Sequence, residues 1–119
     1  MDFDEIFGFG DLNLSFPVRL DGFAGEDFTY SVYCDAAPED KVDAVKAAVS
    51  RFQTEQEDPD VYYGDVSVLL QDGKILILHD LGNVDPQNNI HAIQRLMTSL
   101  DTLGGIKEVV INEGMGFPF

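Results

Sequence analysis

The sequence predicts an α+β domain, a two-layer sandwich in which two helices cover one face of an antiparallel sheet. Several short segments alternate apolar and polar residues, which is typical of strands with one buried face. Two longer segments repeat apolar residues every three or four positions, as amphipathic helices do. The chain has 119 residues and no linker long enough to divide it, so we expect a single domain over 1–119.

A β-hairpin at residues 65–80 is the most strongly indicated local structure. Residues 65–71 and 74–80 are apolar runs joined by Asp72 and Gly73. A two-residue type I′ turn needs positive φ at both central positions, which Gly adopts freely and Asp tolerates. This turn pairs Gln71 with Lys74 and fixes the register of the whole hairpin.

The predicted register assigns the hairpin side chains to two faces of the sheet. The face expected to pack under the helices carries Val66, Val68, Leu70, Ile75, Ile77 and His79. The opposite, open face carries Ser67, Leu69, Leu76 and Leu78, and it is too apolar to be left bare in water. An N-terminal arm, an aromatic C-terminal tail or a second chain could cover it, the last giving a homodimer or a complex with a partner protein. Covering by the same chain is the commoner outcome in small domains.

The sequence also predicts strands before and after the hairpin along the chain. Residues 1–11 show no sustained period and are expected to form an irregular arm. Residues 12–20 alternate strictly, and Pro17 places this strand at a sheet edge or divides it, because proline lacks a donor N–H. Residues 28–35 predict a second strand and 106–113 the last one. An apolar tail over 114–119 follows.

Two helices are predicted from their starts and apolar stripes. Pro38 and the acids after it open the first helix, and its stripe is Val42, Val45, Val49 and Phe52. Asp85 and Pro86 open the second, and its stripe is Ile90, Ile93, Met97 and Leu100. The pair Gly104 and Gly105 ends the second helix.

The element order is therefore β-β-α-β-β-α-β. Without the first strand, this is the ferredoxin-like β-α-β-β-α-β order, to which the N-terminal strand would be an addition. In the standard ferredoxin-like sheet the strand at 28–35 has neighbours on both sides. The first strand must then extend a sheet edge, or the standard order does not hold. Many unrelated functions share this order, so it predicts no activity.

Charge is the extreme feature of the composition. Twenty-two acidic residues against seven basic ones give a net charge of −15. Such a surface repels nucleic acid and anionic membranes and attracts basic partners over long distances. An acidic surface can also serve solubility alone. The acids are concentrated in residues 1–35, where Arg19 is the only base, and in residues 55–65, which have none.

The concentrated acids are the predicted partner-binding residues. They are Asp21, Glu26, Asp27, Glu55, Glu57, Asp58, Asp60 and Asp65. Tyr62 and Tyr63 are candidate aromatic anchors, because tyrosine is enriched at interfaces. These tyrosines are equally compatible with the start of the next strand.

No motif predicts catalysis, a metal or a cofactor. One cysteine and two histidines lack the clustered spacing that zinc needs, and the glycine pairs lack a phosphate-loop context. His79 and His91 are interpreted as ordinary strand-end and surface residues, and Cys34 as a small core residue. The single cysteine, with no signal-peptide or membrane-span pattern, predicts a cytoplasmic protein without disulfides.

We therefore expect a non-enzymatic acidic binding or inhibitory protein with a basic protein partner, such as an immunity protein that neutralises a toxin. One alternative is a phage- or plasmid-type nucleic-acid mimic that inhibits a host defence complex. Another is a small-ligand-binding or enzymatic ferredoxin-like domain. Steep salt dependence of binding would favour the first two, and a pocket with convergent polar groups would favour the third.

Overall fold

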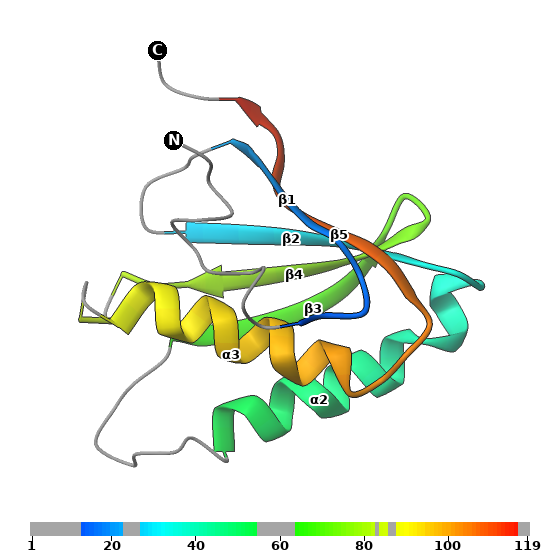
Figure 1. The fold of residues 1–119 in the computed structure, drawn as a ribbon, viewed down its shortest axis with the longest axis horizontal. Coiled ribbons are helices and arrows are strands. Elements are labelled where there is room, and N and C mark those ends of the chain that lie inside the picture. Colours follow the sequence, from blue (N-terminus) through cyan, green and yellow to red (C-terminus); the bar gives the residue numbers. More distant parts are fainter. Residues whose placement is uncertain (1–12, 23–26, 55–63, 83, 86–87, 117–119) are drawn as a thin grey trace.

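The computed structural model describes residues 13–22, 27–54, 64–82, 84–85 and 88–116. Within these residues the chain forms a five-stranded mixed sheet and two α-helices, so the predicted α+β class is confirmed (Figure 1). In chain order the elements are β1 (Val18–Gly22), β2 (Asp27–Cys34), the 3₁₀ turn η2 (Pro38–Asp40), α2 (Val42–Thr54), β3 (Asp65–Gln71), β4 (Lys74–Asp80), α3 (Asn89–Asp101) and β5 (Ile106–Gly116).

The strand order in the sheet is β1-β5-β2-β4-β3. The pairs β5–β2, β2–β4 and β4–β3 are antiparallel, whereas β1 runs parallel to β5. The prediction of a purely antiparallel sheet is therefore wrong. Nearly the whole chain separates β1 from β5, so no short turn forces these two strands to run in opposite directions.

The first strand lies at a sheet edge, but it is shorter than predicted. Asn13 has a φ of 56°, and β1 begins only at Val18, directly after Pro17. The Pro17 carbonyl accepts a hydrogen bond from the Val109 N–H at 3.0 Å, which starts the contact with β5. Proline can accept a hydrogen bond but cannot donate one, so it stands at the start of an edge strand and not inside it.

The hairpin follows the prediction in every pair. Asp72 and Gly73 have φ values of 52° and 78°, as the type I′ turn requires. The register runs from Gln71 opposite Lys74 to Asp65 opposite Asp80. The pairing and the alternation of faces are therefore as predicted, but Leu70, assigned to the face under the helices, is 40% exposed, so its predicted burial is wrong.

One hydrophobic core joins the helices to one face of the sheet. The helices contact each other, and their buried side chains form a single cluster with those of the strands. The strand contribution is Phe28, Tyr30, Val32, Ile75, Ile77, Ile106, Val109 and Ile111. This arrangement is compatible with a two-layer sandwich. Ile90, placed in the predicted apolar stripe, is 38% exposed, whereas Leu96, predicted to broaden the stripe, is buried, as is the unpredicted Ala92.

The ends of the chain differ from the prediction in one respect. Strand β5 continues to Gly116, so the first three residues of the predicted apolar tail belong to the sheet. The predicted arm at residues 1–11 lies outside the described residues, as do residues 117–119. None of the helices in the described part of the chain is both long and apolar enough to cross a bilayer.

Candidate functional site

The side chains of the open face form rows across β2, β4 and β3, because these strands pair in register. Asp27 lies opposite Asp80, which lies opposite Asp65 on its other side. The next rows are Thr29, Leu78 and Ser67, and then Ser31, Leu76 and Leu69. Lys74 and Gln71 pair beside the hairpin turn. Rows on one face of a sheet are about 6.7 Å apart along the strands, and neighbouring strands are about 4.8 Å apart.

The first row, which we call the aspartate row, consists of Asp27, Asp80 and Asp65. All three residues are exposed. The Gly82 N–H donates a hydrogen bond to Asp80 Oδ1 at 2.9 Å. Within the described part of the chain, none of the three carboxylates forms an ion pair with a base. Like charges directly opposite each other destabilise a sheet, so this row works against the fold. Features of that kind are expected at functional surfaces.

A recess of about 550 Å³ lies at the same end of the sheet. Its lining comes from three short segments, which are residues 27–29, 65–67 and 78–80. On the open face these segments supply the aspartate row, the Thr29 and Ser67 hydroxyls and the Leu78 side chain, whereas the side chains of Phe28 and Val66 belong to the opposite face, which packs on the core. The recess therefore combines negative charge with apolar surface.

Buried residues support this end of the sheet from the core side. The Tyr30 hydroxyl lies 2.8 Å from His79 Nδ1, and both residues are buried. Burial raises the pKa of Tyr30 well above its ordinary value, so the hydroxyl keeps its proton. The Phe52 ring meets His79 edge-on at 6.1 Å. His79 is thus a packed core residue, as the sequence indicated for a strand-end histidine.

The apolar part of the open face is exposed mainly on β3 and β4. Leu69 is 36% exposed and Leu78 is 38% exposed, and Leu76 between them is half-buried. Ser31 and Val110 pair on the same face towards β5, yet they are only 2% and 0% exposed. The accessible leucines therefore adjoin the recess and not the β5 side of the sheet.

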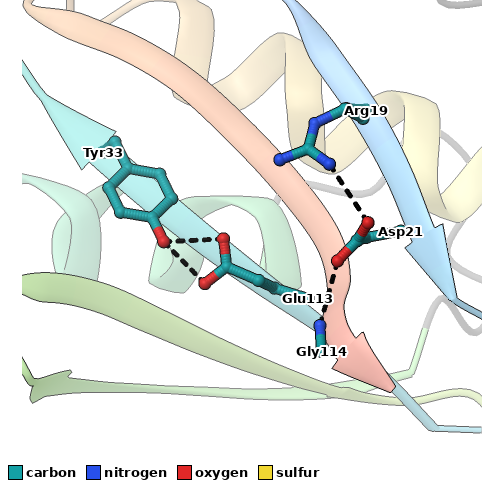
Figure 2. Close-up of polar contacts among 5 residues, drawn as sticks. All are labelled: Arg19, Asp21, Tyr33, Glu113 and Gly114. Atoms are coloured by element: carbon teal, nitrogen blue, oxygen red, sulfur yellow. Dashed lines mark hydrogen bonds and ion pairs between the residues drawn. The ribbon is translucent and has the colours of Figure 1, made fainter. Parts of the chain in front are cut away.

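A neutralised polar cluster joins Lys74 and Tyr33, near the hairpin-turn end of the open face, to Glu113 of β5. Glu113 accepts hydrogen bonds from the Tyr33 hydroxyl at 2.6 Å and from Lys74 Nζ at 2.7 Å (Figure 2 shows the Tyr33 contact). The Lys74 ammonium, followed by the Tyr33 hydroxyl, lowers the pKa of Glu113. The Glu113 carboxylate in turn raises the pKa of Lys74 and of Tyr33. The open face is therefore acidic at one end and balanced in charge at the other.

Asp21 belongs to a third location, on β1. One of its carboxylate oxygens lies 3.1 Å from the Arg19 guanidinium, and the other accepts the Gly114 N–H at 3.0 Å (Figure 2). Asp21 thus links β1 to β5 and has both oxygens occupied. It stands apart from the recess, because β5 and β2 lie between β1 and β4.

The sheet brings together two of the predicted partner-binding acids, Asp27 and Asp65, with the predicted leucines nearby. Asp80 was not predicted, although the hairpin register already places it opposite Asp65. The remaining predicted residues lie outside the described part of the chain; they are Glu26, Glu55, Glu57, Asp58, Asp60, Tyr62 and Tyr63. Glu26 directly precedes Asp27 in the sequence, and the 55–63 segment leads into β3.

Among the residues that the structure describes, no group of three or more His, Cys, Asp or Glu side chains is arranged to hold a metal ion. No protein-family model, curated protein or solved structure matches this chain. The geometry and charge of the open face are therefore the basis for a functional proposal.

Proposed function

We propose that this protein is a non-catalytic binding or inhibitory protein that presents its open face to a basic protein partner, as an immunity protein does to a toxin. The observation that carries the proposal is the aspartate row beside the exposed Leu69 and Leu78. The carboxylates supply charge complementarity to a basic surface, and the leucines supply apolar area that association would bury.

The net charge of the chain favours the same class of partner. A charge of −15 attracts a basic protein over long distances and accelerates the encounter. The carboxylates of the aspartate row are the proposed point of contact for such a partner. A nucleic acid or a second copy of this chain would bring negative charge towards negative charge.

We also infer that β2, α2, β3, β4, α3 and β5 form a ferredoxin-like unit. The order β5-β2-β4-β3 supports this inference, as do the antiparallel pairings within it. Strand β1 is then an addition beside β5. A unit of this kind serves many functions, so the functional proposal depends on the open face and not on the fold.

The proposal is tested by affinity capture from the source cell with two charge-matched variants. The site variant is Asp65→Lys with Asp80→Lys, and the control is Glu39→Lys with Asp43→Lys, two exposed acids on η2 and α2. Both variants change the net charge equally, so only the position of the charge differs. We expect the wild type and the control to capture the same basic protein and the site variant to lose it.

The affinity for the captured protein is then measured at low and at high salt. We expect at least tenfold weaker binding by the site variant, and a steep loss of wild-type affinity with added salt. Equal binding of the partner to both variants would contradict the proposal. So would an affinity that does not change with the salt concentration. The identity of the captured protein decides between neutralisation of a toxin and inhibition of a nucleic-acid-binding defence complex.

A further inference from the structure

The recess beside the exposed leucines has the chemistry of a receptor for one kind of side chain. Its lining joins the apolar side chain of Leu78 to the three carboxylates of the aspartate row. A matching group needs an apolar stem and a cationic end, because the stem replaces water on the apolar lining and the cation faces the carboxylates. Arginine and lysine side chains have this form.

Arginine fits the geometry of the recess better than lysine. Directly paired residues of an antiparallel sheet have Cα atoms about 4.5–5.5 Å apart, so the three carboxylates form a short line. The planar guanidinium has five N–H donors and can reach more than one carboxylate at once. It is also more weakly hydrated than an ammonium group, so it loses less on entering a partly apolar recess.

We propose that the recess seats an arginine side chain of the partner protein, a step that rests on the function proposed above. The partner segment then continues over Leu78 towards Leu76 and Leu69. The row of Leu76 and Leu69 lies two row spacings from the aspartate row, which is about 13 Å along the strands. The partner therefore carries an arginine with apolar side chains at that distance.

The charges on the open face fix the direction in which this segment lies. The aspartate row stands at one end, and Lys74 beside the hairpin turn stands at the other, already paired with Glu113. A basic residue placed at the Lys74 end would meet an ammonium that Glu113 already balances, whereas at the recess end it meets three carboxylates that form no ion pair within the described residues. The partner segment consequently docks with its basic end at the recess.

The charge of the recess, and not its volume, carries the inference, because a recess of this size suits a small ligand as well as a side chain. At about 550 Å³ it falls within the range of about 300–1,000 Å³ that is usual for ligand pockets. It holds one guanidinium with its stem and ordered water around it. Arginine side chains in such pockets are frequent binding hot spots.

The inference is tested by nuclear magnetic resonance on the full chain with a minimal probe. The ¹⁵N-labelled protein is titrated with N-acetyl-L-arginine amide and, as the matched control, with the uncharged isostere N-acetyl-L-citrulline amide. We expect saturable shifts at the amides of Thr29, Ser67 and Leu78 with the arginine probe, and at least fivefold weaker binding of the citrulline probe. Equal shifts from the two probes would overturn the inference.

Aspartate-to-asparagine variants test whether the arginine probe binds in the recess. Asp80→Asn and Asp65→Asn are each expected to weaken the arginine probe about fivefold, whereas Asp43→Asn on α2 leaves it unchanged. Asparagine keeps an oxygen that can accept the Gly82 N–H, so the strand end stays intact. Shifts spread over acids all around the surface would overturn the inference. So would saturable binding of magnesium chloride or self-association at the same residues.

These experiments distinguish a failure of the arginine-receptor inference from a failure of the proposed binding function. If the arginine probe does not bind but partner capture still depends on Asp65 and Asp80, the arginine receptor is wrong and the binding function stands. If the arginine probe binds in the recess but capture of a basic partner does not depend on Asp65 and Asp80, the proposed function is wrong. The recess is then still a site specific for arginine.

Discussion

Lys74 Nζ on β4 lies 2.7 Å from Glu113 Oε1 on β5, although β2 runs between these two strands. Tyr33 on β2 completes the bridge, because its hydroxyl donates to both oxygens of Glu113 at 2.6 Å. Lys74 Nζ also lies 5.9 Å from the centre of the Tyr33 ring. One carboxylate thus links three strands across the open face.

Replacing Glu113 with glutamine is expected to lower the free energy of unfolding by about 0.5–1 kcal/mol. The change removes a partly exposed ion pair and two charge-assisted hydrogen bonds, and solvent screens part of that energy. Urea denaturation followed by circular dichroism measures the difference. Glu39→Gln, an exposed acid on η2 outside the sheet, is the control and is expected to change stability by less than about 0.5 kcal/mol. Equal losses in the two variants would show that the bridge contributes nothing specific.

The contribution of Glu113 is expected to disappear in acid. Lys74 and Tyr33 hold the pKa of the folded Glu113 carboxyl below its ordinary value of 4.5. A depressed folded pKa gives stability that is complete above the unfolded pKa and is lost as the pH falls through the folded one. The difference between wild type and Glu113→Gln is therefore expected to be constant from about pH 7 to about pH 5 and to vanish near pH 2. A difference that persists near pH 2 would point to lost packing and not to charge.

The hairpin shows why part of this fold can be predicted from the sequence. Its turn, register and two faces follow from Asp72, Gly73 and a period of two, all of which act within sixteen residues. The exposed leucines Leu69 and Leu78 follow from the same register. Short-range patterns thus predicted the apolar part of the candidate site.

The aspartate row could be only half predicted, because its third member depends on distant pairing. Asp65 and Asp80 are related by the hairpin, but Asp27 joins them only through the pairing of β2 with β4. The parallel pairing of β1 with β5 could not be predicted for the same reason, since it joins residues about ninety positions apart. Patterns of period two place a side chain on a face of the sheet and say nothing about which strands are neighbours.

Asn112 is another feature that no pattern indicated. It is fully buried with a φ of 56°, and β5 bulges there. Its Oδ1 accepts the Thr29 N–H of β2 at 3.0 Å, and its Nδ2 donates to the Gly22 carbonyl of β1 at 3.2 Å. The side chain therefore supplies hydrogen bonds that the β5 backbone does not make at this point.

Two substitutions separate the roles of the Asn112 backbone and side chain. Asn112→Gly keeps the positive φ but leaves the Thr29 N–H and the Gly22 carbonyl without this partner, so it is expected to lose about 1–3 kcal/mol of stability. Asn112→Ala adds the strain of a left-handed alanine and is expected to lose about 1 kcal/mol more. Urea denaturation of both variants tests this order. An Asn112→Gly variant as stable as the wild type would show that the side-chain hydrogen bonds are dispensable.

Gly64 is expected to tolerate no side chain. Its φ is +96°, and a Cβ atom there would lie 2.5 Å from the Asp80 carbonyl oxygen and 3.0 Å from His79 Nε2. Gly64→Ala is therefore expected to lower the free energy of unfolding by at least about 2 kcal/mol. Gly104→Ala is the control, because that site has a φ of +69° but open space around it, and about 1 kcal/mol is expected from strain alone. Thermal unfolding measures the loss of stability in both variants. Gly64→Ala combines backbone strain with the close contact to β4, whereas Gly104→Ala has backbone strain alone. Equal losses of stability would therefore exclude a role for the contact with β4.

Adjacent residues of β4 test whether the open face is accessible in solution. Leu78 is 38% exposed on that face, and its neighbour Ile77 is fully buried in the core. Threonine favours strands as both residues do, so it changes burial without changing strand propensity greatly. Leu78→Thr is expected to lower the free energy of unfolding by less than about 1 kcal/mol, and Ile77→Thr by about 2–4 kcal/mol because it places a hydroxyl in the core. Urea denaturation measures both values. A loss at Leu78 as large as that at Ile77 would mean that this face is covered within the folded chain, and a docking surface there would be ruled out.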